Sequence, residues 1–428
     1  MKDVIKRLNS IIRNEKFGLF ILSIIASIIN YAFQIYLGHK LDVGEYGEFN
    51  YELAFITNCY ALYAPLAVYA CKITSENGRR LKPNHLIFKQ IISVTIILSA
   101  VIMIAVPLYR FVSEDTSREN SFGYMVLLVF TIVGVSIATL ILGVVQGLAH
   151  YWAYGFFNVI LMASKLGIAF FTQNDVSGAL QSILLSELLI LLLVIIYLRR
   201  IKKRENDENY PLFDKLPYMD IAKLYGGIFL IQLLNSLYVN NGELMLMHHR
   251  FSDTDLGIYS VAALLSRIGV YITSIISTII LPEIAYNSKN STKTLDTTLR
   301  NAFAAAFGIS AVYLLALIFL RRYIIDFLYG PDYVRSGDLI LYMIPFVIGV
   351  ALIPVINSFY LGISKVRIIG GLYIAGVLMA AIGTFGLKLS IEILVIWYGV
   401  IMLLIDIFGY IAGINLCKKI RTSEEKGI

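Results

Sequence analysis

The sequence predicts an all-α integral membrane protein made of two related halves. The chain has 428 residues, of which 58% are hydrophobic and only 15% are charged, whereas soluble domains carry about 25% charged residues. Apolar runs of about 20 residues, the length that a bilayer crossing requires, recur from end to end. Because lipid offers no partners to backbone polar groups, these runs are expected to be helices. A large soluble core, the alternative, would not confine charge to the gaps between such spans.

An internal repeat supports the division into halves. Residues 45–54 are matched by residues 255–264, at an offset of 210. Each copy has an acid, a glycine two residues later and an aromatic two residues after that, and each opens a long apolar run. A second match has an offset of 215 and pairs Gln146-Gly147 and Gly155 with Leu361-Gly362 and Gly370. Internal symmetry of this kind is typical of membrane proteins with two related halves, many of which are transporters.

Twelve transmembrane helices are predicted, six in each half. The first six spans are about 17–37, 50–71, 89–109, 123–147, 151–171 and 178–198. The second six are about 222–247, 256–282, 302–320, 337–360, 367–386 and 391–416. Only His150 and its neighbours separate span four from span five. We therefore expect an N-terminal lobe at 1–198, a linker at 199–221, a C-terminal lobe at 222–416 and a tail at 417–428.

The distribution of Lys and Arg predicts the orientation of the chain. If the N-terminus is cytoplasmic, the inside segments hold 26 basic residues and the outside loops hold eight. This bias predicts that both termini are cytoplasmic and that the number of spans is even. The net charge of +7 follows from the same bias and gives no argument for nucleic-acid binding. Residues 1–16 lack a signal-peptide cleavage site and are interpreted as an interfacial helix or as a basic tail.

Motifs for catalysis or for cofactor binding are missing from the sequence. No metal-ligand cluster, phosphate-binding loop or nucleophile elbow is present, and the three cysteines are scattered. His248 and His249 are adjacent, so their side chains point in different directions on a helix. No predicted outside loop exceeds about 20 residues, which leaves no room for an extracellular catalytic domain. We expect no metal, no cofactor, no enzymatic activity and no ATP hydrolysis by the chain itself.

Ionisable residues within the predicted spans are the candidates for function. The cations are Lys165 and Arg267, and the acids are Glu187, Glu243 and Asp406, with Glu52 at the outer start of span two. A charge at the centre of a bilayer costs about 2.5–3.5 kcal/mol on insertion scales. One interpretation is charge pairing, of Glu243 with Arg267 or of Lys165 with Glu187. The other is a cationic cavity for an anionic substrate, in which the acids serve as proton or sodium sites.

Amide side chains in the spans suggest a polar cavity. They are Asn30 and Gln34 in span one, Gln232, Asn235, Asn240 and Asn241 in span seven, and Asn357 in span ten. Amides offer hydrogen bonds to sugars or head groups without the cost of a charge. The alternative is hydrogen bonding between helices, worth about 0.6 kcal/mol each.

Three sequence elements resemble those of a known family. Residues 44–49, at the start of span two, and residues 255–262, at the start of span eight, resemble the equivalent segments of bacterial polysaccharide flippases. Residues 328–333, before span ten, are similar to a third element of that family. These flippases belong to the MATE-like (multidrug/oligosaccharidyl-lipid/polysaccharide, MOP) superfamily. The resemblance covers the whole chain and implies two six-helix lobes around a central cavity that opens alternately to each side.

The resemblance also implies a function. A flippase of this family moves undecaprenyl-diphosphate-linked oligosaccharide across the bacterial cytoplasmic membrane for O-antigen or capsule synthesis. Arg267 stands where related lipid-linked precursor flippases have a lumenal cation, and we expect Arg267 and Lys165 to bind the diphosphate. The expected partners are this lipid-linked substrate, membrane lipid, H⁺ or Na⁺ as an antiported ion, and a polysaccharide polymerase with its chain-length regulator.

Other functions remain open from the sequence. The first alternative is an ion-coupled exporter of drugs or small cations from the same superfamily, which gains little from intramembrane cations. An integral membrane polysaccharide polymerase is the enzymatic alternative, but a large charged outside loop is expected for it. A membrane scaffold without transport activity is the third and leaves the intramembrane cations unexplained.

Overall fold

The computed structural model describes residues 15–76, 81, 85–112, 122–204, 236, 242–271, 273–274, 276–277, 280, 284, 294–363 and 365–425. Every regular element in these ranges is a helix. In the described residues nine helices are long and apolar enough to cross a membrane, and a bent pair forms a tenth. The protein is therefore a multi-pass membrane protein. The prediction of twelve spans extends beyond the described ranges and stays a prediction, as does the location of the termini.

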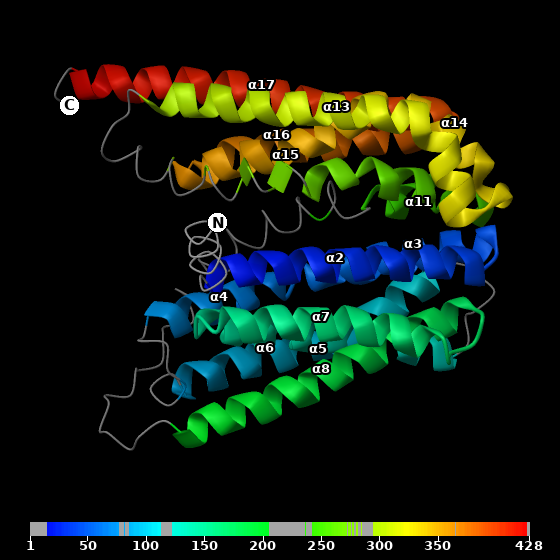
Figure 1. Cartoon of the computed structure of the whole chain (residues 1–428), viewed down its shortest axis with the longest axis vertical. Helices are drawn as coiled ribbons and strands as arrows, with labels where there is room; N and C mark the ends of the chain where they lie inside the picture. The colour runs from blue at the N-terminus through cyan, green and yellow to red at the C-terminus, as the bar shows by residue number, and fades with distance from the viewer. Residues whose placement is uncertain are drawn as a thin grey trace, which may run out of the picture. The chain divides into compact units, whose positions relative to one another are not determined.

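Within the described residues the first half has seven helices (Figure 1). They are α2 (Glu15–Lys40), α3 (Val43–Tyr60), α4 (Ala64–Glu76), α5 (His85–Val112), α6 (Phe122–Gly147), α7 (Tyr151–Ala169) and α8 (Val176–Arg204). Predicted span two is the pair α3 and α4, bent by 51°. Pro65 lies in the first turn of α4, where its missing N–H costs no helical hydrogen bond. The separation of spans four and five is confirmed, because Ala149 turns the chain between α6 and α7 with a φ of 58°.

The second half, which begins with predicted span seven, is described only in part. Its elements are α10 (Glu243–Met247), α11 (Asp253–Ser266), α13 (Leu295–Tyr329), η2 (Pro331–Tyr333), α14 (Val334–Tyr342), α15 (Ile344–Gly362), α16 (Val366–Ala381), η3 (Ile382–Gly386) and α17 (Ile391–Glu425). Predicted span seven, at 222–247, and the later part of span eight lie largely outside the described residues. Predicted span ten is divided into α14 and α15 at Met343, because Pro345 lacks the N–H that would continue a single helix.

The contacts group the chain into two compact units with corresponding internal packing. Unit 1 comprises residues 1–41 and 55–233, and unit 2 comprises residues 42–54 and 234–428. In unit 1, α6 packs against α5 and α8, and α7 packs against α8. In unit 2, α15 packs against α13 and α17, and α16 packs against α17. These helices occupy equivalent places in the two predicted halves, so the sequence repeat is also a repeat of packing. The predicted lobe boundaries stay a prediction.

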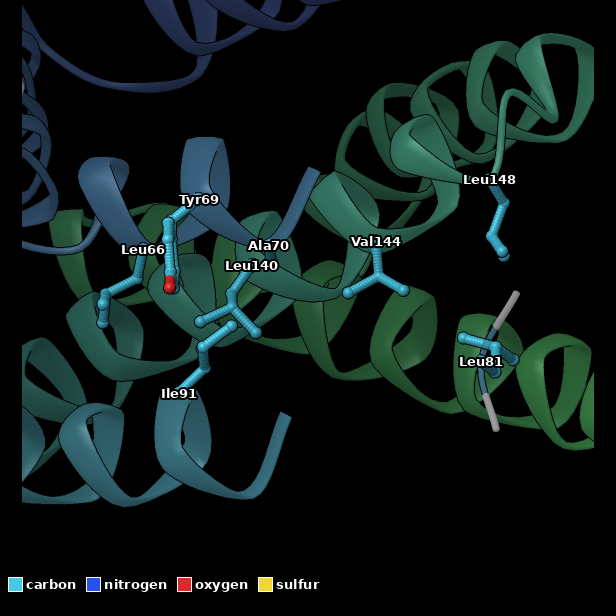
Figure 2. Packing of buried hydrophobic residues seen from close by; sticks show 8 residues of the cluster. All are labelled: Leu66, Tyr69, Ala70, Leu81, Ile91, Leu140, Val144 and Leu148. Atoms are coloured by element: carbon cyan, nitrogen blue, oxygen red, sulfur yellow. The ribbon is translucent and has the colours of Figure 1, made fainter. Parts of the chain in front are cut away.

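The centre of unit 1 is helix α6, which contributes to two hydrophobic clusters. Figure 2 shows Leu66, Ile91 and Leu140 pointing toward one another from α4, α5 and α6. On its other side α6 joins a second cluster that includes Leu161 of α7 and Ile190 of α8. The sequence of α6 is apolar around its whole circumference, as expected of a helix buried between neighbours.

The repeated acid is part of a helix cap in both copies. Asp42 accepts a hydrogen bond from the Glu45 backbone N–H at 2.7 Å, and the Glu45 carboxylate accepts one from the Asp42 N–H at 3.4 Å. Ser252, which corresponds to Asp42 at the offset of 210, accepts a hydrogen bond from the Asp255 N–H at 3.2 Å. Both arrangements satisfy N–H groups at a helix start that have no partner within the helix. The acid in the repeat therefore starts the helices α3 and α11.

The repeated glycine lets these two helix starts touch inside unit 2. A Cβ atom on Gly47 would lie 2.6 Å from the Gly257 N atom and closer still to the Asp253 carbonyl oxygen. A Cβ atom on Gly257 would lie 3.0 Å from the Val43 carbonyl carbon and closer still to its oxygen. The obstacles are backbone atoms, which do not move aside as a side chain does. The two copies of the repeat thus form one crossing at which only glycine fits.

The third family-like element lies against the first copy of the repeat. Helix α13 ends at Gly330, whose φ of 84° suits glycine and whose N–H bonds back to Ile325 and Asp326 carbonyls. Tyr329, the last residue of α13, and Tyr333, in the turn after Gly330, lie against Tyr46, with ring centroids 6.2 and 5.9 Å away. Tyr46 and Tyr333 are almost completely buried. Three segments that carry the family resemblance are therefore parts of one packed region of unit 2.

Candidate functional site

Two of the predicted site residues meet in a buried cluster of unit 2. Glu243 opens α10, and Arg267 follows the last residue of α11, where its N–H bonds to the Ala263 carbonyl at 3.0 Å. The Arg267 guanidinium donates to Glu243 Oε1 as an ion pair. The Tyr259 hydroxyl donates to the same oxygen at 2.6 Å. Of the two interpretations, pairing of Glu243 with Arg267 is therefore what this structure contains.

The surroundings of this pair make it sensitive to change. The side chains of Arg267 and Glu243 are only 8% and 6% exposed. The guanidinium also lies over the Phe346 ring, 5.0 Å from its centroid. In a buried environment the Coulombic attraction of the pair offsets the cost of desolvating both charges. Removal of one partner leaves the other as an unpaired buried charge. Glu243 Oε2 has no hydrogen-bond partner within the described part of the chain, so the carboxylate has capacity for a further donor or an ion.

A cavity of about 150 Å³ lies beside Glu243. Its walls come from α10, α16 and α17 and are apolar except for Glu243 and Tyr398. The Tyr398 hydroxyl is 2.6 Å from Thr384 Oγ1, in the π-helical turn η3 that ends α16. The Thr384 carbonyl accepts from Arg250 at 2.8 Å. A glycan finds few partners in this cavity, whereas a lipophilic cation or a single ion matches one acid with apolar walls.

The other predicted cation, Lys165, is buried in unit 1 between α7 and α2. It is 9% exposed, and its ammonium lies 3.5 Å from Asn30 Oδ1 and 4.5 Å from the centroid of the Phe33 ring. Glu187 on α8 is equally buried, and its charge acts on Lys165 through space. Within the described residues no direct ion pair joins them. Lys165 is thus held by an amide oxygen and an aromatic face, and its ammonium keeps donors for a further anion.

The remaining predicted residues are placed as follows. Gln34 and Glu52 are buried, at 4% and 0% exposure. Asn357 accepts from the Tyr373 hydroxyl at 2.6 Å, which makes it a link between α15 and α16. Asn235, Asn240 and Asn241 lie outside the described residues. For Asn357 the structure therefore favours hydrogen bonding between helices over lining a cavity.

Asp406 is the most isolated of the predicted acids. It is 0% exposed, and neither of its carboxylate oxygens has a hydrogen-bond partner in the described part of the chain. An ionised carboxylate in an apolar interior without a partner costs far more free energy than taking up a proton. We therefore expect Asp406 to be a neutral acid in this structure.

The packing of α15 on α17 locates Asp406 further. Contacts at a constant offset of 53 join the two helices, at Phe346 with Gly399, Gly349 with Met402 and Ile356 with Gly409. If the same offset holds between these contacts, Asp406 corresponds to Ile353, the residue before Pro354. Because Pro354 has no N–H, the Val350 carbonyl lacks its donor within the helix. A protonated Asp406 offers a hydrogen-bond donor in the same part of the contact between α15 and α17.

The substitution Asp406→Asn is expected to change the free energy of unfolding by less than about 1 kcal/mol, because it replaces one neutral side chain by another of the same shape. Thermal unfolding in detergent, compared with that of the native protein, measures this. Glu243→Gln is the matched contrast, since it removes the charge that stabilises Arg267. A loss for Asp406→Asn as large as that for Glu243→Gln would mean that Asp406 is ionised and paired.

Comparison with solved structures gives a consistent result. The first is the inward-facing conformation of a multidrug resistance MATE family transporter of the MOP superfamily, with a TM-score of 0.68, 15% identity, and coverage of 93% of this chain and 96% of the other. The second is MATE in the straight conformation, with a TM-score of 0.66, 15% identity, and 95% and 97% coverage. The chain has the MATE transporter fold. No protein-family model matches the sequence, and no curated protein matches it.

A third solved structure has the same fold with a different pocket. It is a MOP superfamily transporter from Pyrococcus furiosus, described as having a reverse polarity of its binding pocket that suggests a different function. It has a TM-score of 0.63, 15% identity, and 95% and 97% coverage. At these identities the likeness concerns the fold. The MATE fold thus supports pockets of more than one polarity.

Within this MATE fold the structure adds residues that the sequence did not indicate. Tyr259 supports Glu243, and Phe33 lies under Lys165. One sequence signal was present for Tyr259, because the repeated aromatic is Phe49 in the first copy and Tyr259 in the second. The hydroxyl group therefore exists only in the half that also has the ion pair.

Proposed function

We propose that this protein is a flippase that moves undecaprenyl-diphosphate-linked oligosaccharide across the bacterial cytoplasmic membrane by alternating access, for surface polysaccharide such as O-antigen or capsule. The observation that carries the proposal is the buried Lys165, whose ammonium is held by an amide and an aromatic ring in place of a directly paired carboxylate. An anionic substrate supplies the direct ion-pair partner that Lys165 lacks within the described residues. The MATE fold supports a transporter, and the family-like segments support this class of substrate.

In this proposal Lys165 and Arg267 bind the diphosphate. Lys165 contributes a point charge, and Arg267 contributes a planar guanidinium that can donate two hydrogen bonds to one phosphate group. Amides such as Asn30 and Gln34 line the path of the glycan, together with Asn235, Asn240 and Asn241. The polyprenyl chain stays in the bilayer. The chain crosses the membrane twelve times with both termini in the cytoplasm, and a polysaccharide polymerase with its chain-length regulator receives the product.

Glu243 links the proposed substrate to an ion gradient. While Glu243 is ionised, its pair with Arg267 has no net charge, and the pair attracts phosphate poorly. A proton on Glu243 removes the competing carboxylate and makes the guanidinium available to the diphosphate. Protonation of Glu243 is thus proposed as the coupling step, with H⁺ as the ion. Na⁺ is the other candidate ion, and Glu187, Asp406 and Glu52 are the remaining candidate acids.

The second candidate function is export of cationic drugs in exchange for an ion. It is favoured by the apolar cavity beside Glu243, because apolar walls suit a lipophilic cation and Glu243 Oε2 has no hydrogen-bond partner within the described residues. It is disfavoured by Lys165, whose buried positive charge repels a cation.

The substitution Lys165→Gln is expected to lower the rate of flipping at least about tenfold, since it removes a charge-assisted contact of about 1.5–3 kcal/mol with the substrate phosphate. Purified protein in liposomes is given fluorescent undecaprenyl-diphosphate-linked oligosaccharide, and appearance of the glycan in the opposite leaflet is measured with a membrane-impermeant reagent. Lys419→Gln, which alters an exposed cation at the end of α17, is the matched control.

The same liposomes separate the two candidate functions. Efflux of a cationic dye by the native protein, with no flipping of the lipid-linked glycan, would reject the flippase in favour of the exporter. Normal flipping by Lys165→Gln would remove Lys165 from the phosphate-binding role.

A further inference from the structure

An open groove lies at one end of unit 1, between the start of α5 and the end of α8. It has a volume of about 330 Å³ and combines an apolar floor with three cations. Lys89 comes from the first turns of α5, and Arg199 and Lys202 come from the last turns of α8. Arg199 and Lys202 are three residues apart, so they share one face of the helix. Helix α6 packs against both α5 and α8.

The floor of the groove is fixed by the core of unit 1. Phe88 and Leu198 line the groove and also pack against the cluster of Leu66, Ile91 and Leu140 in Figure 2. Leu81, labelled in the same figure, belongs to both the cluster and the lining. The groove therefore exists before any ligand arrives, which lowers the cost of binding.

The charges of the groove have no counterpart in the described structure. None of its described lining residues is acidic, and within the described part of the chain Lys89, Arg199 and Lys202 form no ion pair. All three side chains are exposed. Three cations around one small hollow attract a group with negative charge, such as a phosphate.

The apolar surface next to the groove continues along both helices toward the middle of the membrane. On α5, Ile92 is 52% exposed and Ile96 is 62% exposed. On α8, Leu192 is 56% exposed and Ile196 is 40% exposed. A soluble phosphate compound makes no use of these two surfaces. A lipid whose head group sits at the cations places its acyl chains along them.

We propose that this groove is a binding site for an anionic diacyl phospholipid, with the phosphodiester at Lys89, Arg199 and Lys202 and the acyl chains along α5 and α8. The site lies at the helix ends that the Lys and Arg bias assigns to the cytoplasm, where anionic head groups attract basic residues by about 1 kcal/mol each. The two apolar helix faces fit two acyl chains better than the single chain of a polyprenyl carrier. The proposal is independent of the transported substrate.

Native mass spectrometry of the delipidated full-length protein tests this site, with phosphatidylglycerol and phosphatidylcholine of identical acyl chains as probes. The native protein is expected to bind one phosphatidylglycerol more tightly than phosphatidylcholine. Each of Lys89→Gln, Arg199→Gln and Lys202→Gln is expected to weaken the binding of phosphatidylglycerol about fivefold. The triple variant is expected to abolish the preference for phosphatidylglycerol over phosphatidylcholine. The triple variant Lys365→Gln, Lys418→Gln and Lys419→Gln removes the same amount of charge from unit 2 and is expected to keep the preference for phosphatidylglycerol.

Three outcomes would overturn the proposal. Equal loss of phosphatidylglycerol in both triple variants would mean that net charge, and no particular site, attracts the lipid. Displacement of the bound lipid by millimolar glycerol phosphate would indicate a soluble ligand. Displacement by an equimolar amount of undecaprenyl phosphate would indicate a port for the polyprenyl carrier. Each variant should unfold at the same temperature as the native protein, which shows that the loss of lipid binding is not a consequence of misfolding.

Discussion

Arg267→Met alone is expected to abolish transport and to lower the free energy of unfolding by about 3–5 kcal/mol, the usual cost of stranding one partner of a buried ion pair. The reason lies in the contacts of Glu243. Its Oε1 accepts from Arg267 and from Tyr259, and the side chain is 6% exposed. Without the guanidinium a buried carboxylate remains, with only the tyrosine hydroxyl as its donor. Thermal unfolding of purified protein measures the loss, and the liposome assay measures transport.

The double variant Arg267→Met, Glu243→Gln separates a structural role from a functional one. It removes both charges and keeps the shapes close, so we expect it to recover most of the lost stability. Its transport is expected to stay absent, because the guanidinium that is proposed to bind phosphate is still missing. If the double variant transports lipid-linked glycan at the native rate, the pair is only structural and Lys165 remains as the proposed phosphate ligand.

Gly47→Ala and Gly257→Ala are each expected to destabilise unit 2 by about 3 kcal/mol or more, at the upper end of the cost of overpacking. An added methyl group at either position meets backbone atoms of the opposite helix start. The helices α3 and α11 must then separate, which also disturbs Tyr46 and Tyr259 on the same turns. Yield of monodisperse protein and thermal unfolding in detergent report the effect.

Gly308→Ala is the matched control for these two variants. Gly308 lies inside α13, and no atom of the described structure is within 4 Å of the position its Cβ would take. Because alanine favours a helix over glycine by about 1 kcal/mol, this change is expected to be neutral or stabilising. Unfolding of Gly47→Ala at the same temperature as Gly308→Ala would contradict the close crossing.

The sequence predicted the positions of the described membrane helices because lipid restricts the choice of backbone structure. A run such as 123–147 has to become a helix in the bilayer, and α6 has almost the same bounds. Pro345 inside predicted span ten indicated a kink from the sequence, and the structure breaks this span at Met343, between α14 and α15. The caps on α3 and α11 were missed, because Asp42 and Ser252 perform the same role with different side chains.

The candidate site was predictable in its residue types and in one contact, the pair of Glu243 with Arg267, which was one of two interpretations. Glu243 and Arg267 are 24 residues apart on different helices, so their meeting depends on how α10 and α11 pack. The sequence offered Glu187 as the partner of Lys165, and the structure puts Asn30 and Phe33 in direct contact with it. Which neighbour is nearest depends on the rotation of each helix about its axis, and that rotation is set by packing across the whole unit.

The placement of residues 42–54 with unit 2 has a consequence for how such a chain is assembled and how it arose. A gene cut at 199–221 separates the two predicted lobes, yet the second fragment lacks the segment that places Gly47 on Gly257. The second fragment is therefore expected to need co-expression with the first, which carries residues 42–54. An ancestral single-copy half could have completed itself only by lending this segment to a sister molecule. Gene fusion would then have made permanent an exchange that began between two separate chains.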